Sequence, residues 1–124
     1  MVARQRVEHS EQVKLVGRVR AFMPDVLIAA IPNGGSRTPQ ERVSLHAEGV
    51  LAGMPDLAIL EPRKGFHGLF IEMKTETGRS SPDQVDMAVK LNHRGYLCLV
   101  ARSCEDGWKF IEQYLEGEYV RQVG

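Results

Sequence analysis

Four short apolar runs alternate with helix-like segments, and this alternation constrains the fold more than any other feature of the sequence. The runs are VLIAAI at 26–31, DLAIL at 56–60, LFIEMK at 69–74 and YLCLVA at 96–101. The first run is rich in branched side chains and stops at Pro32-Asn33-Gly34-Gly35, which is typical of a strand followed by a loop. Strands that alternate with helices predict an α/β domain. A chain of 124 residues has the size of one such domain, so we expect a single domain over residues 1–124.

Helical patterns occupy the segments between these runs. An apolar stripe that repeats every three or four residues predicts a helix from Glu11 to Met23. The segments TPQE at 38–41 and SPDQ at 81–84 combine a capping hydroxyl, an early proline and an acid or amide three residues on, so each predicts a helix start. A last helix is expected from Ser103 to Gly117. The predicted order is α, β, α, β, β, α, β, α.

The strand-like runs also predict neighbours and burial. The linker EPRKGFHG at 61–68 is long enough for a hairpin, so 56–60 and 69–74 should be antiparallel neighbours. The run at 96–101 lacks polar alternation and should be buried on both faces, with Cys98 as a buried thiol. Two cysteines are too few to predict a disulfide framework or a zinc site.

Charge separates the two ends of a chain whose formal net charge is +0. Residues 1–42 hold seven basic and four acidic residues, whereas the last 22 residues hold two basic and five acidic ones. A basic N-terminal third beside an acidic tail predicts either one phosphate-facing side or two solvated surfaces. No run has the length of a membrane span, and the N-terminus lacks an apolar signal-peptide core. We therefore expect a soluble, cytoplasmic protein with no membrane partner.

The candidate chemistry lies in the two runs of the expected hairpin. Alternation along 69–74 places Glu72 and Lys74 on the face opposite the apolar Leu69, Ile71 and Met73. Taken alone, this charged face could be a solvent-facing strand edge. However, Asp56 opens the neighbouring run directly after a turn, so a hairpin can bring it near Glu72. Two close carboxylates repel unless a cation lies between them, which predicts a Mg²⁺ site.

The same residues resemble a known nuclease signature. Pro55-Asp56 followed by Glu72-Met73-Lys74 resembles the signature of the PD-(D/E)XK superfamily. The sequence around this motif resembles the small VRR-NUC family within that superfamily. That narrower resemblance also includes the segments NGG at 33–35, GMPDL at 53–57 and GRSSPDQ at 78–84. It implies a restriction-endonuclease-like fold, with a central mixed sheet flanked by helices, and a Mg²⁺ or Mn²⁺ cofactor.

The resemblance also implies roles for single residues. Asp56 and Glu72 would be metal ligands with the Met73 backbone carbonyl, and Lys74 would position the attacking water. Gln84 matches a glutamine beside such sites; the alternative is an N3 capping residue, and one side chain can fill both roles.

Two further groups of residues complete the expected site. Glu11 matches a first-helix acid and shares the stripe of Leu15 and Val19, but a frayed, solvated first turn is the alternative. Phosphate-binding candidates are Arg37, Arg42, Arg79 and Ser81; for the arginines, the alternative is a side chain that only faces solvent.

The function that these features favour is a metal-dependent DNA endonuclease without an organic cofactor. The resemblance implies a homodimer of phage or bacterial type that cuts branched DNA, such as four-way junctions, and leaves 5′-phosphates. A monomer that nicks single strands is the alternative assembly. The alternative functions are a non-catalytic nucleic-acid-binding module that retains the nuclease fold, and a structural domain whose charged strand end is an ion-pair cluster.

Overall fold

A computed structural model describes residues 3–32 and 38–122 of the chain. Its eight elements follow the predicted order: α1 (Ala3–Phe22), β1 (Ile28–Ala30), α2 (Pro39–Ala47), β2 (Leu57–Ile59), β3 (Gly68–Met73), α3 (Pro82–His93), β4 (Tyr96–Ala101) and α4 (Cys104–Leu115). The α/β prediction is therefore confirmed. The segment at 33–35 and Arg37, which carried part of the sequence argument, lie outside the described residues.

The four strands form one mixed sheet in the order β1-β2-β3-β4. β1 and β2 pair antiparallel, as do β2 and β3, whereas β3 and β4 run parallel. The expected antiparallel pairing of 56–60 with 69–74 is thus confirmed. β3 has a neighbour on each side, and all six of its residues are buried. The solvent-facing edge considered for this strand is therefore wrong.

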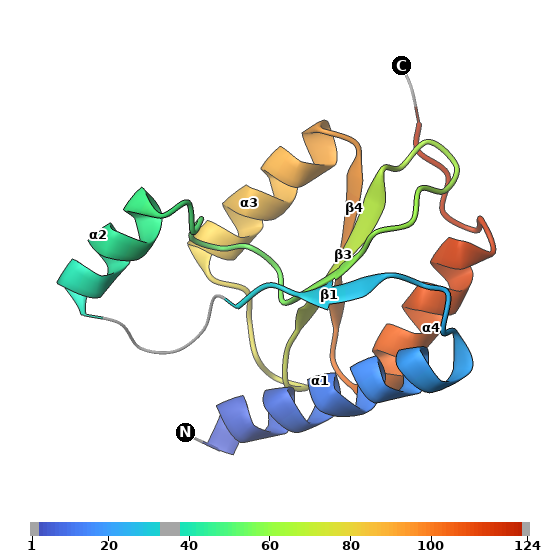
Figure 1. The fold of residues 1–124 in the computed structure, drawn as a ribbon, viewed down its shortest axis with the longest axis horizontal. Coiled ribbons are helices and arrows are strands. Elements are labelled where there is room, and N and C mark those ends of the chain that lie inside the picture. The colour runs from blue at the N-terminus through green and yellow to red at the C-terminus, as the bar shows by residue number, and fades with distance from the viewer. Residues whose placement is uncertain (1–2, 33–37, 123–124) are drawn as a thin grey trace.

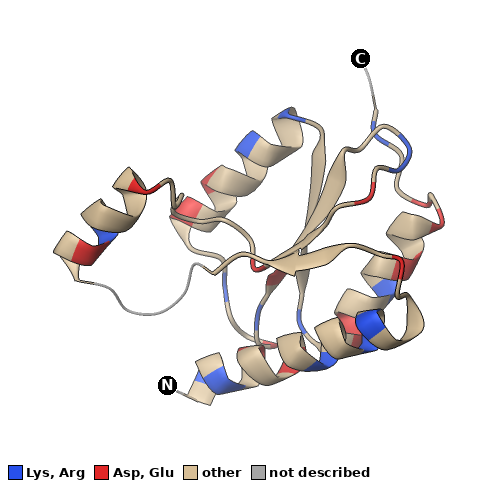
Figure 2. Cartoon of the chain, viewed as in Figure 1, with Lys and Arg blue, Asp and Glu red and all other residues tan. Residues whose placement is uncertain are grey.

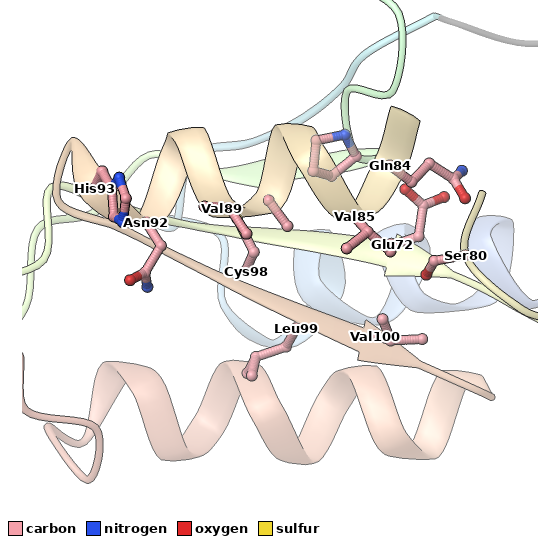
Figure 3. A pocket seen from close by; sticks show the side chains of 12 residues that line it. Glu72, Ser80, Gln84, Val85, Val89, Asn92, His93, Cys98, Leu99 and Val100 are labelled. Carbon is pink, nitrogen blue, oxygen red and sulfur yellow. The ribbon is translucent and has the colours of Figure 1, made fainter. Parts of the chain in front are cut away.

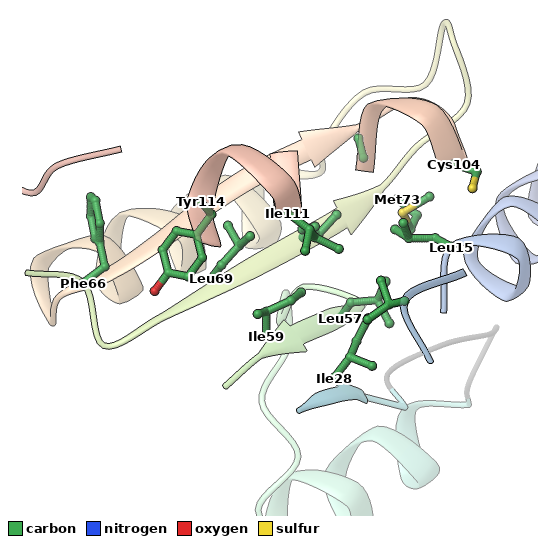
Figure 4. Packing of buried hydrophobic residues seen from close by; sticks show 13 residues of the cluster. Leu15, Ile28, Leu57, Ile59, Phe66, Leu69, Met73, Cys104, Ile111 and Tyr114 are labelled. Carbon is green, nitrogen blue, oxygen red and sulfur yellow. The ribbon is translucent and has the colours of Figure 1, made fainter. Parts of the chain in front are cut away.

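The helices cover both faces of the sheet (Figure 1). α1 and α4 pack on one face, where Leu15, Ile111 and Tyr114 meet strand residues such as Leu69 and Ile71. This cluster is the main core, shown in Figure 4, and its β3 positions are the predicted apolar face of 69–74. α3 covers the opposite face through a smaller cluster around Phe70 and Leu91. The polar face of β3 therefore lies under α3, with Glu72 at one end of the strand.

Two sequence expectations need correction. β4 is an edge strand and is only half-buried, with Val100 38% exposed, because no fifth strand pairs with it among the described residues. Cys98 is accordingly half-buried, although burial still raises the pKa of its thiol to about 11. α1 begins at Ala3, eight residues before the predicted start at Glu11. Its first turns bury no residue and so left no apolar stripe in the sequence.

The basic and acidic ends of the chain meet where α1 packs against α4. The Arg18 guanidinium lies 2.9 Å from the Glu105 carboxylate and 4.2 Å from the centroid of the Trp108 ring. Figure 2 shows both signs of charge along α1 and at the ends of β3 and β4 beside it. Part of the N-terminal positive charge thus faces the protein's own acidic helix. In the described segments, no helix is both long and apolar enough to cross a membrane.

Candidate active site

Asp56 and Glu72 lie opposite each other at one end of the β2–β3 hairpin. The register pairs Leu57 with Ile71, so the next position along brings Asp56 level with Glu72. The Asp56 carboxylate accepts a hydrogen bond from the Met73 backbone N–H at 2.7 Å. This bond holds Asp56 against β3, although β2 itself begins one residue later. The approach of the two carboxyl groups expected from the sequence is therefore present.

The Glu72 carboxyl is strongly perturbed by this neighbour. Its residue is only 8% exposed. Its pKa is raised to about 9, first by burial and then by a hydrogen bond to Asp56 and by the Asp56 charge, while the Lys74 charge opposes them. Without a cation, the two carboxyl groups are therefore most stable when they share a proton.

A glycine sets the path of the chain into this site. Gly53 has a φ of 82°, a conformation that side chains with a Cβ rarely adopt. A Cβ at this position would collide with the carbonyl of Asp83 in the first turn of α3. Only glycine thus lets the turn before Asp56 pack against the beginning of α3. This contact brings Asp56 to the end of the helix that carries Gln84.

Gln84 and Ser81 form the predicted capping box at the start of α3. The Gln84 N–H donates to the Ser81 hydroxyl at 3.2 Å, and the Ser81 N–H donates to the Gln84 Oε1 at 2.8 Å. Gln84 also lines, with Glu72 and Ser80, a groove of about 490 Å³ between α3 and β4 (Figure 3). Because the cap uses Oε1, the Nε2 group of Gln84 remains a donor toward a ligand. The capping and site roles are compatible.

Lys74 follows the last residue of β3. Its backbone N–H donates to the Ala101 carbonyl at 2.9 Å, which continues the parallel pairing with β4 by one residue. Its side chain is half-buried, and its charge lowers the pKa of Glu72. The structure thus brings together Asp56, Glu72, Lys74 and Gln84, as the sequence suggested.

Glu11 is engaged elsewhere. Its carboxylate accepts from the Cys104 N–H at 3.2 Å, at the first turn of α4, and pairs with Lys14 at 3.1 Å. Both contacts hold the pKa of Glu11 below its ordinary value. The α1 acid whose charge acts on Glu72 is instead Glu8, one turn earlier. Sequence reasoning missed Glu8 because the predicted helix began at Glu11.

The phosphate-binding candidates are spread over several elements. Arg79 is exposed in the connection between β3 and α3, next to the Ser81 cap. Arg42 lies on α2, which buries none of its residues and projects away from the sheet (Figure 1). Arg37 lies outside the described residues. Ser81 therefore contacts the site residue Gln84, and Arg79 lies two residues before Ser81, whereas Arg42 lies on the helix that projects away from the sheet.

The donor set fits a hard divalent cation. Asp56 and Glu72 offer only oxygen atoms, as Mg²⁺ and Mn²⁺ prefer, and the repulsion between their two negative charges would be relieved by a cation between them. Within the described parts of the chain, no group of three or more His, Cys, Asp or Glu side chains is arranged to hold a metal ion. A cation here would depend on two carboxylates, backbone oxygen and water, which is the usual pattern for Mg²⁺.

Comparisons with known proteins confirm the resemblance. The family model of the VRR-NUC domain matches residues 5–105. A solved structure described as a VRR-NUC domain protein is 26% identical, with a TM-score of 0.79, over 94% of this chain and 97% of its own. A second, described as a VRR-NUC domain, is 24% identical with a TM-score of 0.57, over 86% of this chain and 96% of its own, and supports the fold alone. No curated protein matches the sequence.

Proposed function

The chain belongs to the VRR-NUC domain family, and from this premise we propose that it is a metal-dependent endodeoxyribonuclease that hydrolyses backbone phosphodiesters. Family membership implies a nuclease-type function and DNA binding. The proposal adds the metal, the reaction and the residues. One observation carries it: a buried Glu72 carboxyl lies against a second carboxyl, Asp56, with the charge of Lys74 nearby.

The proposal gives a task to each residue of the site. Asp56, Glu72 and the Met73 carbonyl hold the cation, and the Met73 N–H keeps the Asp56 carboxylate in place. A bound Mg²⁺ or Mn²⁺ neutralises charge on the phosphate and lowers the pKa of a coordinated water. The Lys74 ammonium orients the attacking water, and the free Nε2 of Gln84 donates to a phosphate oxygen.

The α1 acid of the site is Glu8 rather than Glu11. Its charge is the smallest of the causes that raise the pKa of Glu72. A third negative charge near the pair would add to the attraction for a divalent cation. Glu11 instead has a structural role at the beginning of α4.

The DNA backbone would be held by Arg79 and Ser81 beside the site, and by Arg37 and Arg42 farther out. Phosphate contacts dominate affinity for DNA, and the 16 basic residues of this chain are balanced by 16 acidic ones, so its net charge is +0. We therefore propose a homodimer, which doubles this surface and presents two sites to two strands of a branched DNA. Residues 1–124 would act as one nuclease domain in a bacterial or phage-infected cytoplasm, leaving 5′-phosphate products.

The test uses end-labelled DNA. The purified protein is incubated with a four-way junction or a linear duplex of matched sequence, each in EDTA, Mg²⁺ or Mn²⁺, and the products are resolved on a denaturing gel. Cuts that need metal and occur only in the junction support the full proposal. Metal-dependent cuts in both DNAs support the metal-dependent hydrolysis but refute the preference for the junction. Tight binding without cleavage in either metal refutes the enzyme and favours a non-catalytic binding module.

Assembly is measured on the same samples. Sedimentation of the free protein and of its junction complex distinguishes one copy from two. A monomer that cleaves the junction at the same rate over a wide range of protein concentrations contradicts the dimer while leaving the chemistry intact.

A further inference from the structure

An arginine outside the predicted site lies beside Lys74. Arg102 is the residue that follows β4, and the pairing of Met73 with Ala101 brings Lys74 and Arg102 to the same end of the sheet. The Arg102 Nη1 donates to the Thr75 carbonyl at 2.8 Å and also to the Gly78 carbonyl. One guanidinium therefore joins both ends of the turn at 75–78, which follows β3.

This turn packs against Lys74. The Gly78 N–H donates to the Thr75 hydroxyl at 3.0 Å and closes the turn internally. Gly78 is buried, and a Cβ added to it would lie 2.9 Å from the Thr75 Oγ1 and 3.7 Å from the Lys74 Cδ. The backbone of the turn thus borders the aliphatic stem of Lys74. A shift of the turn would give the ammonium group a wider range of positions.

Arg102 is itself held from the other side. Its backbone N–H donates to the Asp106 carboxylate at 3.1 Å, in the first turn of α4. The contacts form a continuous series from α4 through Arg102 and the turn to Lys74. Charge-assisted bonds of a guanidinium to carbonyls are stronger than neutral ones, so this series can keep its geometry at an exposed end of the sheet.

We propose that Arg102 is a positioning residue for Lys74: it clamps the turn at 75–78 and thereby fixes the ammonium group relative to Asp56 and Glu72. This inference rests on the proposed nuclease function, because the position of Lys74 matters only if Lys74 acts on the attacking water. Arg102 contacts no reacting group in this assignment. Its loss should therefore slow the reaction without weakening DNA binding.

The test compares three variants of the full chain. Arg102→Gln removes the charge and the reach of the guanidinium, and Arg102→Lys keeps the charge. Arg94→Gln is the matched control, because Arg94 is also exposed and its Nη1 donates to the Lys90 carbonyl at 2.8 Å, at the far end of α3. Each variant is assayed for kcat and KM on the cleaved DNA, and for amide hydrogen exchange in a peptide spanning 74–81.

The clamp predicts a split in the kinetic constants. Arg102→Gln should lower kcat by about 10- to 100-fold, the cost of misplacing a group by about 1 Å, and leave KM within about twofold. Arg102→Lys should recover part of kcat, and exchange in 74–81 should rise in Arg102→Gln alone. A raised KM with an unchanged kcat would instead identify Arg102 as a phosphate contact and overturn the proposal. Unchanged exchange in Arg102→Gln would overturn it as well.

Failure of the proposed function has a different signature. If wild-type protein cleaves no DNA in either metal, the nuclease assignment is lost whatever Arg102 does. The exchange measurement then decides by itself whether Arg102 holds the turn, because it needs neither metal nor DNA. If Arg102→Gln shows faster exchange in 74–81 but the kcat of wild type, Arg102 holds the turn, and its proposed effect on Lys74 is refuted.

Discussion

Glu72 and Glu11 are both glutamates that the sequence analysis assigned to one site. In the structure their carboxyl groups have different partners, and their pKa values shift in opposite directions. Glu11 accepts a backbone N–H at the start of α4 and pairs with Lys14, so its pKa is lowered. Glu72 lies buried beside Asp56, so its pKa is raised to about 9. The fold supplies Glu11 with positive partners and gives Glu72 mainly another acid.

This difference separates a structural carboxylate from a functional one. A satisfied carboxylate stabilises the native state as it stands. A carboxyl held against a like charge costs stability unless a proton or a cation joins the pair, and such strain concentrates at functional sites. The carboxylate pair at the β2–β3 end is therefore the place where added positive charge should have its greatest effect.

The largest effect should follow from breaking the acidic pair. Asp56→Asn keeps an oxygen that can accept the Met73 N–H but removes one negative charge from the cation site. We expect cleavage to fall by roughly 10³-fold, since a bound metal is worth several kcal/mol to such a transition state. Calorimetric titration with Mn²⁺ checks the cause. Metal affinity equal to wild type would count against this site, whereas Glu11→Gln, as the control, should keep both affinity and cleavage.

A smaller loss should follow from removing the neighbouring cation. Lys74→Ala takes away the ammonium that opposes the raised pKa of Glu72. We expect cleavage to drop by about 10²-fold or more, the usual contribution of a group that positions or activates water. DNA affinity, measured by fluorescence anisotropy in EDTA, should stay close to wild type. Normal cleavage by this variant would show that our assignment of Lys74 is mistaken.

The sequence was sufficient for the parts that depend on local pattern. The capping motifs at Thr38 and Ser81 placed two helix starts correctly because a hydroxyl cap and an early proline act within one turn. Alternation along 69–74 identified the apolar core face, and the hairpin brought Asp56 level with Glu72. These features are set by neighbours a few residues apart.

Features that depend on tertiary packing could not be predicted from the sequence. The burial of β4 was overestimated because its apolar run gave no sign that it would be an edge strand. Glu8 was missed because the first turns of α1 have no buried stripe. Arg102 was missed because its carbonyl partners lie 27 and 24 residues away. In each case the deciding contact lies on another element.

The two acids of α1 offer a third test, in which a single helix carries both kinds of carboxylate. Glu8→Gln should slow cleavage by about 10-fold, as loss of an outer charge at a metal site does, with little change in stability. Glu11→Ala should leave cleavage unchanged and cost about 1 kcal/mol of stability, because a helix start loses its acceptor. Urea unfolding and the gel assay measure the two effects. Reversed outcomes would return Glu11 to the site.

The smallest expected effect is a pair of opposite pH dependences in metal-free protein. Because the pKa of Glu72 rises from 4.5 to about 9 on folding, the unfolded chain holds fewer protons there than the native one between these values, and stability falls as pH rises. For Glu11 the pKa is lowered, so its stabilisation is present above the unfolded value and is lost in acid.

Thermal unfolding in EDTA from pH 4 to 9 measures the contributions of Glu72 and Glu11 to stability. For each pH, the unfolding temperature of Glu72→Gln or Glu11→Gln is compared with that of wild type. Glu72→Gln should match wild type near pH 4.5 and become progressively more stable than wild type toward pH 9. Glu11→Gln should be less stable than wild type at neutral pH and converge with it in acid. Parallel curves for the two variants would mean that the acids experience similar surroundings. Saturating Mn²⁺ should remove the alkaline loss in wild type, because a cation replaces the shared proton between Asp56 and Glu72.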